Sequence, residues 1–279
     1  ISGLLIFILK GPDLGIDFKG GTELIVDTGN YDSNDYALKN KISTFLNQYN
    51  IDISRIKSYG TKKIQLLFDA TDFNKETINE KMLDFGDGSL KVLSYNKIGS
   101  TISSELTNNA LQALLIAVLL IGFYIIIRFD WYSALGSIIA IIHDILIVIS
   151  ILMFFSYQFD INIIAAFLII IGYSLNDTIV VFDRMRENLE EYSNMELHQI
   201  INLSLNETLS RTTITSLTTL FVLFSLFLFG GSSLGGLSFS LIIGIISGTY
   251  SSIFIATPIM MFLREKYYTE ENIKEEEWQ

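Results

Sequence analysis

The chain has 279 residues, of which 50% are hydrophobic and 18% are charged, and its mean hydropathy is +0.43. No charged residue occurs in the segment 212–263, and an apolar run of that length is typical of membrane-spanning segments. This composition excludes a cytosolic enzyme and a nucleic-acid-binding protein, for which the net charge of −11 is also unfavourable. The absence of cysteine excludes a secreted disulfide scaffold.

The first segment, 1–10, is apolar up to Lys10. It is too short to span a membrane alone, because a spanning helix needs about 20 apolar residues. It lacks the charged start and the small-residue cleavage site of a signal peptide. We therefore expect residues 1–10 to be the end of a first transmembrane helix that begins before this sequence.

Residues 13–105 have the composition of a water-soluble domain. Apolar and polar residues alternate as in strands, or recur with helical spacing, in six consecutive segments. The predicted strands are 20–27, 53–59, 63–68 and 89–95, and the predicted helices are 34–49 and 74–85, with turns at Gly60-Thr61 and Gly86-Asp87-Gly88. This β-α-β-β-α-β order predicts a ferredoxin-like α+β domain.

Residues 106–263 read as a five-helix transmembrane region, which with the first helix makes a six-span helical bundle. The predicted spans are approximately 106–127, 131–155, 161–182, 207–229 and 234–262. After residue 105, Lys and Arg occur only at or next to the predicted connection 128–130, at or next to the predicted connection 184–206, and in the C-terminal segment. By the positive-inside rule these parts are cytoplasmic, so the soluble domain lies on the outer side and residues 264–279 form an acidic cytoplasmic tail.

Four ionisable residues lie inside predicted spans, where a charge is costly and therefore suggests a function. They are His143, Asp144, Asp177 and Arg211. From the helical rise, Asp177 lies about 10 Å inside the boundary marked by Arg184, and Arg211 enters from the same side, so an Asp177–Arg211 ion pair is geometrically possible. For His143 and Asp144, a functional role and a role in anchoring a packed helix are equally compatible with the sequence.

Polar residues accompany these charges. Tyr173, Ser174 and Asp177 share a helical face that Asn176 borders. The next predicted span carries a polar stripe, composed of Thr208, Arg211, Thr212, Thr215, Thr218 and Thr219. These residues could line a buried ion pathway, or the hydroxyls could serve only as packing contacts between helices. No catalytic triad, paired catalytic carboxylates, phosphate loop or metal-ligand spacing is evident, so we expect neither an enzyme nor a metal site.

Small residues recur every fourth position in the last predicted span, a spacing that lets a second helix approach closely. They are Gly236, Ser240, Gly244, Gly248, Ser252 and Ala256. A separate charged cluster, at 183–187, marks the cytoplasmic boundary and is interpreted either as a solvated helix end or as a functional group.

Four motifs resemble those of the SecF family, the smaller membrane subunits of the SecDF protein-export complex, which are related to RND transporters. They are Gly15-Ile16-Asp17-Phe18-Lys19-Gly20-Gly21-Thr22, the segment 98–106, the segment Gly172-Tyr173-Ser174-Leu175-Asn176-Asp177 with its continuation to Arg184, and the segment 248–254. The resemblance covers nearly the whole chain and implies an RND-like half with one outer domain. Ser100 departs from it, since the family usually has proline there.

The resemblance implies an accessory subunit of the Sec translocase in the bacterial cytoplasmic (inner) membrane. Together with SecD, it would use the proton motive force to assist preprotein export after the SecYEG channel and the SecA ATPase have begun translocation. Asp177 and Arg211 match the proton-pathway residues of the family, and Asp17, Gly20 and Gly21 match its outer-domain motif. No cofactor is implied, H⁺ is the expected coupling ion with Na⁺ as the alternative, and YajC and YidC are further expected partners.

Two other hypotheses fit the same residues. The chain could be a half-size RND-type exporter of lipids or hydrophobic small molecules that works as a homo-oligomer. It could also be a membrane scaffold in which the buried charges, Asp177 included, only lock helices together.

Overall fold

A computed structural model describes residues 11–49, 51–58, 62–69, 75–85, 90–192 and 194–277, without the side chains of 232–233 and 268–277. The expected first span at 1–10 and the predicted turns at 60–61 and 86–88 lie outside the described residues. The chain divides into two compact units. One contains residues 14–110 and 159–161, and the other contains the long apolar helices.

The first unit contains the predicted β-α-β-β-α-β order, which is confirmed. Its elements are α2 (Ile16–Lys19), β1 (Gly21–Asp27), α3 (Tyr36–Asn47), β2 (Ile53–Ser58), β3 (Lys63–Phe68), α4 (Lys75–Phe85) and β4 (Lys91–Ile98). The strands form one antiparallel sheet in the order β2-β3-β1-β4. The last strand was predicted to end at Tyr95, but pairing of Gly21 with Ile98 carries it three residues further.

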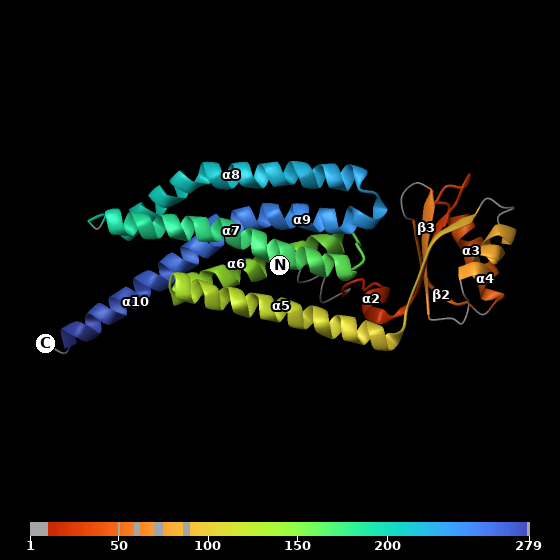
Figure 1. Ribbon diagram of the computed structural model, residues 1–279, viewed down its shortest axis with the longest axis horizontal. Coiled ribbons are helices and arrows are strands. Elements are labelled where there is room, and N and C mark those ends of the chain that lie inside the picture. Colours follow the sequence, from red (N-terminus) through yellow and green to blue (C-terminus); the bar gives the residue numbers. More distant parts are fainter. Residues whose placement is uncertain are drawn as a thin grey trace. The chain divides into compact units, whose positions relative to one another are not determined.

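The core of this unit lies between the sheet and the two helices α3 and α4, which cover one face of the sheet (Figure 1). The buried residues are Leu24, Val26, Leu38, Ile42, Leu46, Ile51, Ile64, Leu66, Phe68, Ile78, Met82, Leu90 and Val92. Helix α3 begins where the Asp35 carboxylate accepts a 2.8 Å hydrogen bond from the Ala37 amide, a typical N-cap. The core is thus formed by every second residue of the strands and by the apolar face of each helix, as the sequence pattern predicted.

Two glycines connect α2 to β1. Gly20 has φ +74° and Gly21 has φ +118°, conformations that side chains with a Cβ rarely adopt. A Cβ on Gly21 would also lie 2.9 Å from the backbone oxygen of Phe68, the last residue of β3, which pairs with the neighbouring Thr22. The turn therefore requires glycine at 21 for two reasons, whereas at 20 only the backbone conformation requires it.

The segment that precedes the glycines is attached to the start of α7 (Ile161–Glu191). The Gly15 amide donates a 2.7 Å hydrogen bond to the Phe159 carbonyl oxygen, and Leu14 forms a parallel bridge with Phe159. The Asp17 carboxylate accepts a 2.9 Å hydrogen bond from the Ile161 amide. Because the first amides of a helix lack partners within the helix, Asp17 caps α7 from a distant part of the chain.

The second unit contains the membrane helices, which run side by side in Figure 1. They are α5 (Ser100–Arg128), α6 (Trp131–Phe154), α7, α8 (Leu197–Phe229), α9 (Ser232–Ser251), a π-helical turn (Ser252–Ala256) and α10 (Thr257–Glu277). Within the described residues, five segments are long and apolar enough to span a membrane, the last running from Leu234 to Tyr267. They correspond to the five spans predicted after residue 105.

The prediction of a loop at 184–206 is wrong. Helix α7 continues to Glu191 and α8 already begins at Leu197. Hydropathy locates only the apolar part of a helix, and these polar extensions are stabilised by ion pairs, such as the 2.7 Å contact between Arg184 and Glu187 one turn apart. The segment predicted as a tail, 264–279, is helical as far as Glu277.

We expect Gly21→Ala to destabilise the sheet more than Gly20→Ala does. Both variants force a Cβ into a positive-φ conformation, at a cost of about 1–3 kcal/mol, and only Gly21→Ala adds a clash with the Phe68 carbonyl. Hydrogen–deuterium exchange of the β1 and β3 amides in the full-length protein measures the effect. Exchange should be slowest in the wild type and fastest in Gly21→Ala; a Gly21→Ala protein that exchanges as slowly as the wild type would contradict this explanation of the turn.

Candidate functional site

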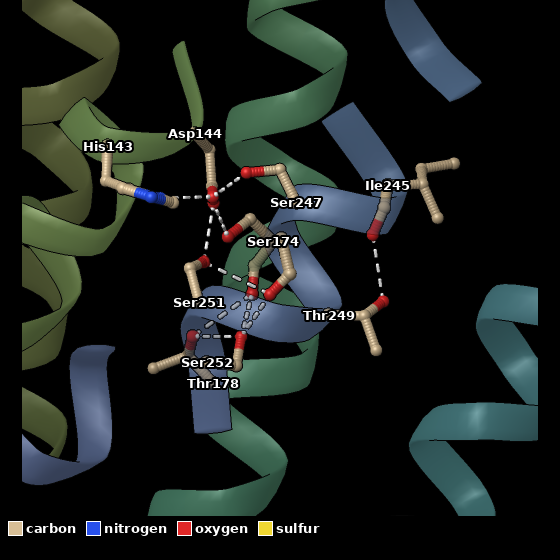
Figure 2. A network of polar contacts seen from close by, with 10 residues as sticks. His143, Asp144, Ser174, Thr178, Ile245, Ser247, Thr249, Ser251 and Ser252 are labelled. Carbon is tan, nitrogen blue, oxygen red and sulfur yellow. Dashed lines mark hydrogen bonds and ion pairs between the residues drawn. The ribbon is translucent and has the colours of Figure 1, made fainter. Parts of the chain in front are cut away.

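The Asp144 carboxylate, on α6, is fully buried and is surrounded by serine hydroxyls from two other helices (Figure 2). Ser174 of α7 and Ser251 of α9 each donate a 2.8 Å hydrogen bond to Oδ2. Ser247 of α9 donates a 2.7 Å hydrogen bond to Oδ1. Three short hydrogen bonds from α7 and α9 therefore converge on one carboxylate of α6.

His143 is the fourth polar partner of this carboxylate. Its Nδ1 atom lies 3.3 Å from Asp144 Oδ1, and its side chain is 31% exposed. The ring also lies beside that of Tyr250 of α9, with 6.4 Å between the ring centroids. The two residues that the sequence singled out as neighbours thus form one group, in which Asp144 is enclosed and His143 is partly accessible.

The Asp177 carboxylate, on α7, is also buried but is held less closely. Its Oδ2 atom lies 3.4 Å from the Ser216 hydroxyl of α8 and 3.5 Å from the Thr249 hydroxyl of α9. These distances are long for hydroxyl–carboxylate hydrogen bonds, which are usually 2.5–3.0 Å. The two hydroxyls bond more tightly to each other, at 2.7 Å. Asp177 is consequently the less firmly bound of the two buried carboxylates.

Arg211 is exposed on α8 and does not contact Asp177 directly. Among the described side chains, which include both residues, no ion pair joins them, although the Arg211 charge acts on the Asp177 carboxylate electrostatically. The direct pair that the sequence allowed is therefore not formed. The helical rise gave the depth of each residue but not the direction in which its side chain points.

The residues predicted to line an ion pathway do not form one common surface but bond to different neighbours. The Tyr173 hydroxyl donates a 2.9 Å hydrogen bond to the Thr215 carbonyl oxygen on α8 and lies 3.0 Å from the Thr219 hydroxyl, whereas Asn176 is exposed. The Thr215 hydroxyl bonds to the carbonyl oxygen of Arg211 in its own helix. Several threonines of the predicted stripe do the same, so most of their hydroxyls are used within α8. Among the described residues, Thr219 is the only threonine of the stripe whose hydroxyl lies within hydrogen-bond distance of a side chain of α7.

Helix α9 approaches α7 closely at its small residues. A Cβ on Gly248 would lie 2.9 Å from the Ser174 Cβ, and one on Gly244 would lie 2.3 Å from the Ile170 side chain. Ser252, in the π-helical turn, contacts the Thr178 hydroxyl at 2.8 Å. Two further residues of the stripe lie nearer the start of α9, where the buried Ser240 bonds to the Gly236 carbonyl oxygen at 2.7 Å, and Ala256 is buried at the end of the π-helical turn.

Helix α9 lies between the two buried carboxylates. Ser247 and Ser251 are one helical turn apart and face Asp144, whereas Thr249 points to the opposite side of the helix (Figure 2). The sequence analysis missed these three residues and Ser216. The sequence does contain a pattern that points to them, because hydroxyl residues at a spacing of four accompany the glycine stripe. Serine and threonine are also ordinary packing residues in membrane helices, so the pattern alone did not predict a site.

The charged cluster at the ends of α7 and α8 is a network and not a set of separate solvated groups. Arg184 contacts Glu207 of α8 at 2.6 Å, and the Asn188 amide donates to Glu207 at 2.8 Å and to Ser204 at 3.0 Å. Glu207 lies one turn before Arg211, so this network fixes the part of α8 from which Arg211 projects. Within the described residues, no cluster of three or more potential metal-ligating side chains occurs.

Comparison with known proteins assigns the family. The sequence model for "Protein export membrane protein SecD/SecF, C-terminal" matches residues 77–266, and that for "SecD/SecF GG Motif" matches residues 6–29. The chain belongs to the SecD/SecF family. The protein translocase subunit SecF of Rhodothermus marinus is 41% identical over 279 residues, covering 95% of this chain and 88% of that protein. The family consists of membrane proteins of protein export, and the apolar helices of this chain agree with a multi-pass membrane protein.

Two further relatives contain the SecF part within a longer chain. The protein translocase subunit SecDF of Brucella abortus is 34% identical and covers 92% of this chain, which corresponds to 34% of that protein. The crystal structure of SecDF from Thermus thermophilus, described as a translocon-associated membrane protein, matches with a TM-score of 0.84 at 32% identity. That match covers 94% of this SecF-family chain and 36% of the SecDF chain.

We expect Gly248→Ala to destabilise the bundle, because the new Cβ would push α9 away from Ser174 and lengthen the hydrogen bonds to Asp144. Overpacking of this kind costs about 1–3 kcal/mol. Gly235→Ala is the matched control, since it lies in the same helix and its Cβ would meet no atom within 4 Å. The thermal midpoint of the purified protein should fall in Gly248→Ala but not in Gly235→Ala. Equal midpoints for the two variants would show that the close approach of α9 and α7 is not needed.

Proposed function

We propose that this chain is an accessory subunit of the Sec protein translocase which, together with a SecD subunit, uses the proton motive force to assist preprotein export. The SecYEG channel and the SecA ATPase would begin translocation, and this subunit would act afterwards. H⁺ is the proposed coupling ion, and Na⁺ is the alternative. The observation that carries this proposal is the buried but loosely held carboxylate of Asp177, on a helix packed against the one that bears Arg211.

The geometry of Asp177 suits a group that gains and loses a proton. Hydrogen bonds to a buried carboxylate favour its ionised form, so one with weak partners is neutralised at a lower energetic cost than one that is firmly hydrogen-bonded. Ser216 and Thr249 lie at long distances from Asp177 and already bond to each other, so they can stay satisfied in either protonation state. Arg211 would stabilise the ionised form from a distance without trapping it in a salt bridge.

A SecD partner would cover the surfaces that the described helices leave open. In α5 and α8 only 17% of the most apolar stretch is buried, compared with 56% in the span from Leu234 to Tyr267. The relatives in which the SecF part is joined to a SecD part in one chain support such a partner. They also favour this proposal over a half-size exporter that works as a homo-oligomer.

The proposed orientation places the sheet domain outside the cell and the C-terminus in the cytoplasm. It follows from Lys and Arg, which after residue 105 occur only at the helix ends near Arg128, Arg184 and Arg264, at Arg211 and beyond Arg264. In this orientation the sheet domain would meet preproteins as they leave the channel. YajC and YidC are further proposed partners, as the family resemblance implies.

We expect Asp177→Asn to abolish the part of preprotein export that depends on the proton motive force. The amide keeps the size and hydrogen-bonding capacity of the side chain but cannot exchange a proton. The measurement is a pulse-chase of preprotein export in cells that carry the variant as the only copy, with and without a protonophore, and with the membrane abundance read from the same samples.

Asp183→Asn is the matched control for this experiment, because Asp183 lies on the same helix but forms an exposed ion pair with Arg128. It should leave export unchanged. Export by Asp177→Asn at the wild-type rate would refute the proton role of Asp177. A loss of export that follows a loss of protein would instead support the scaffold hypothesis.

A further inference from the structure

We propose that Asp144 is a second proton-binding site, separate from Asp177, which exchanges its proton through His143. This inference extends the proposed proton coupling, and its test does not depend on export. It starts from the group in Figure 2, in which a fully buried carboxylate has one titratable neighbour that is partly accessible.

The surroundings of Asp144 provide one proton donor. His143 on α6 lies 3.3 Å away. Further along the helices packed around it, the other titratable groups are Tyr132 on α6, Tyr173, Asp177 and the charged residues 183–191 on α7, and Tyr250 on α9, whose ring lies beside that of His143. No lysine or arginine occurs between Arg128 and Arg184 or between Arg211 and Arg264, so no fixed positive charge lies in these spans to balance the carboxylate. A proton shared with His143 is the balancing charge that the site can obtain.

The transfer step is simple. The Nδ1–H bond of the His143 imidazolium breaks and an O–H bond forms at Asp144 Oδ1, which leaves a neutral imidazole and a neutral carboxyl. The electron pair of the broken bond stays on Nδ1, which can then accept a hydrogen bond from the new O–H group. His143 would regain a proton at the exposed edge of its ring. In both states, His143 Nδ1 and Asp144 Oδ1 can stay hydrogen-bonded to each other.

The network can also adapt to a neutral Asp144. A protonated carboxyl is a weaker acceptor than a carboxylate, so its serine donors need other acceptors. Ser251 has one, because its hydroxyl lies 3.2 Å from the Gly248 carbonyl oxygen. Ser251 is also the last residue of α9 before the π-helical turn, and such turns are frequent at functional sites. Protonation of Asp144 would therefore first change the hydrogen bonds of Ser251, at this end of α9.

Labelling with a hydrophobic carbodiimide, dicyclohexylcarbodiimide, tests the proposal, because it reacts with protonated carboxyls in apolar surroundings. Membranes that contain the full-length protein with its natural partners are treated at graded pH, and the N-acylurea product on each aspartate is quantified by peptide mass spectrometry. We expect Asp144 to be modified at low pH and progressively less as the pH rises. Asp177 serves as the internal reference for access of the reagent, and Asp177→Asn should leave the Asp144 profile in place.

Three variants separate a proton site from a structural anchor. His143→Gln keeps a hydrogen-bond donor but cannot take up and release a proton, so after a jump to low pH the modification of Asp144 should develop roughly 10²-fold more slowly, as expected when a proton-transfer group is removed. Ser247→Ala removes one donor from the carboxylate and should extend the modification to higher pH. Ser238→Ala is its control, because Ser238 bonds only to the Leu234 carbonyl oxygen of its own helix.

The outcomes are distinct. Modification of Asp177 without modification of Asp144 at any pH, or modification of Asp144 that is independent of pH, would overturn the proposal and leave Asp144 as an anchor of α6. A pH-dependent Asp144 in a protein whose Asp177→Asn variant exports normally would support the second site while refuting the proposed role of Asp177.

Discussion

The burial of two carboxylates among apolar helices is the constraint on which the rest of the bundle depends. Removing an ionised carboxylate from water costs several kcal/mol even after the protein relaxes, and each hydrogen bond to a charged group contributes about 1.5–3 kcal/mol. The three short serine bonds to Asp144 are thus of the size needed to offset its burial. The two long contacts of Asp177 supply less, which makes its ionised state the more dependent on its surroundings.

This constraint accounts for the packing of α9. Its hydroxyls reach Asp144 on α6 and Asp177 on α7 only if the helices lie unusually close, and the absence of side chains at Gly244 and Gly248 permits that approach. Asp17 attaches the start of α7 to the segment that leads into the sheet domain. Helix α7, which bears Asp177, is therefore capped at its first turn by Asp17 and packed against α9 around Ile170, Ser174 and Thr178.

Much of this could be predicted from the sequence, because strands with one buried face alternate and an aspartate inside an apolar span is conspicuous. The four strands, two helices and five described spans were found in this way, and so were Asp144 and Asp177 as buried charges. The partners of these charges were not. The rise of a helix gives depth but not rotation, so the sequence could show only that an Asp177–Arg211 pair was geometrically possible. In the structure Arg211 is exposed, and the hydroxyls of Ser216 and Thr249 lie next to Asp177. Hydropathy likewise could not follow α7 and α8 beyond the apolar region, where ion pairs extend them.

The central claim is that Asp177 carries the protons that couple this subunit to export. Its most direct test is the proton flux across proteoliposomes that contain the chain together with its SecD partner, under an imposed pH gradient and membrane potential and in the presence of an unfolded preprotein. We expect a flux in the wild type that is lost in Asp177→Asn at equal amounts of reconstituted protein. Equal fluxes in the two proteins would contradict this account.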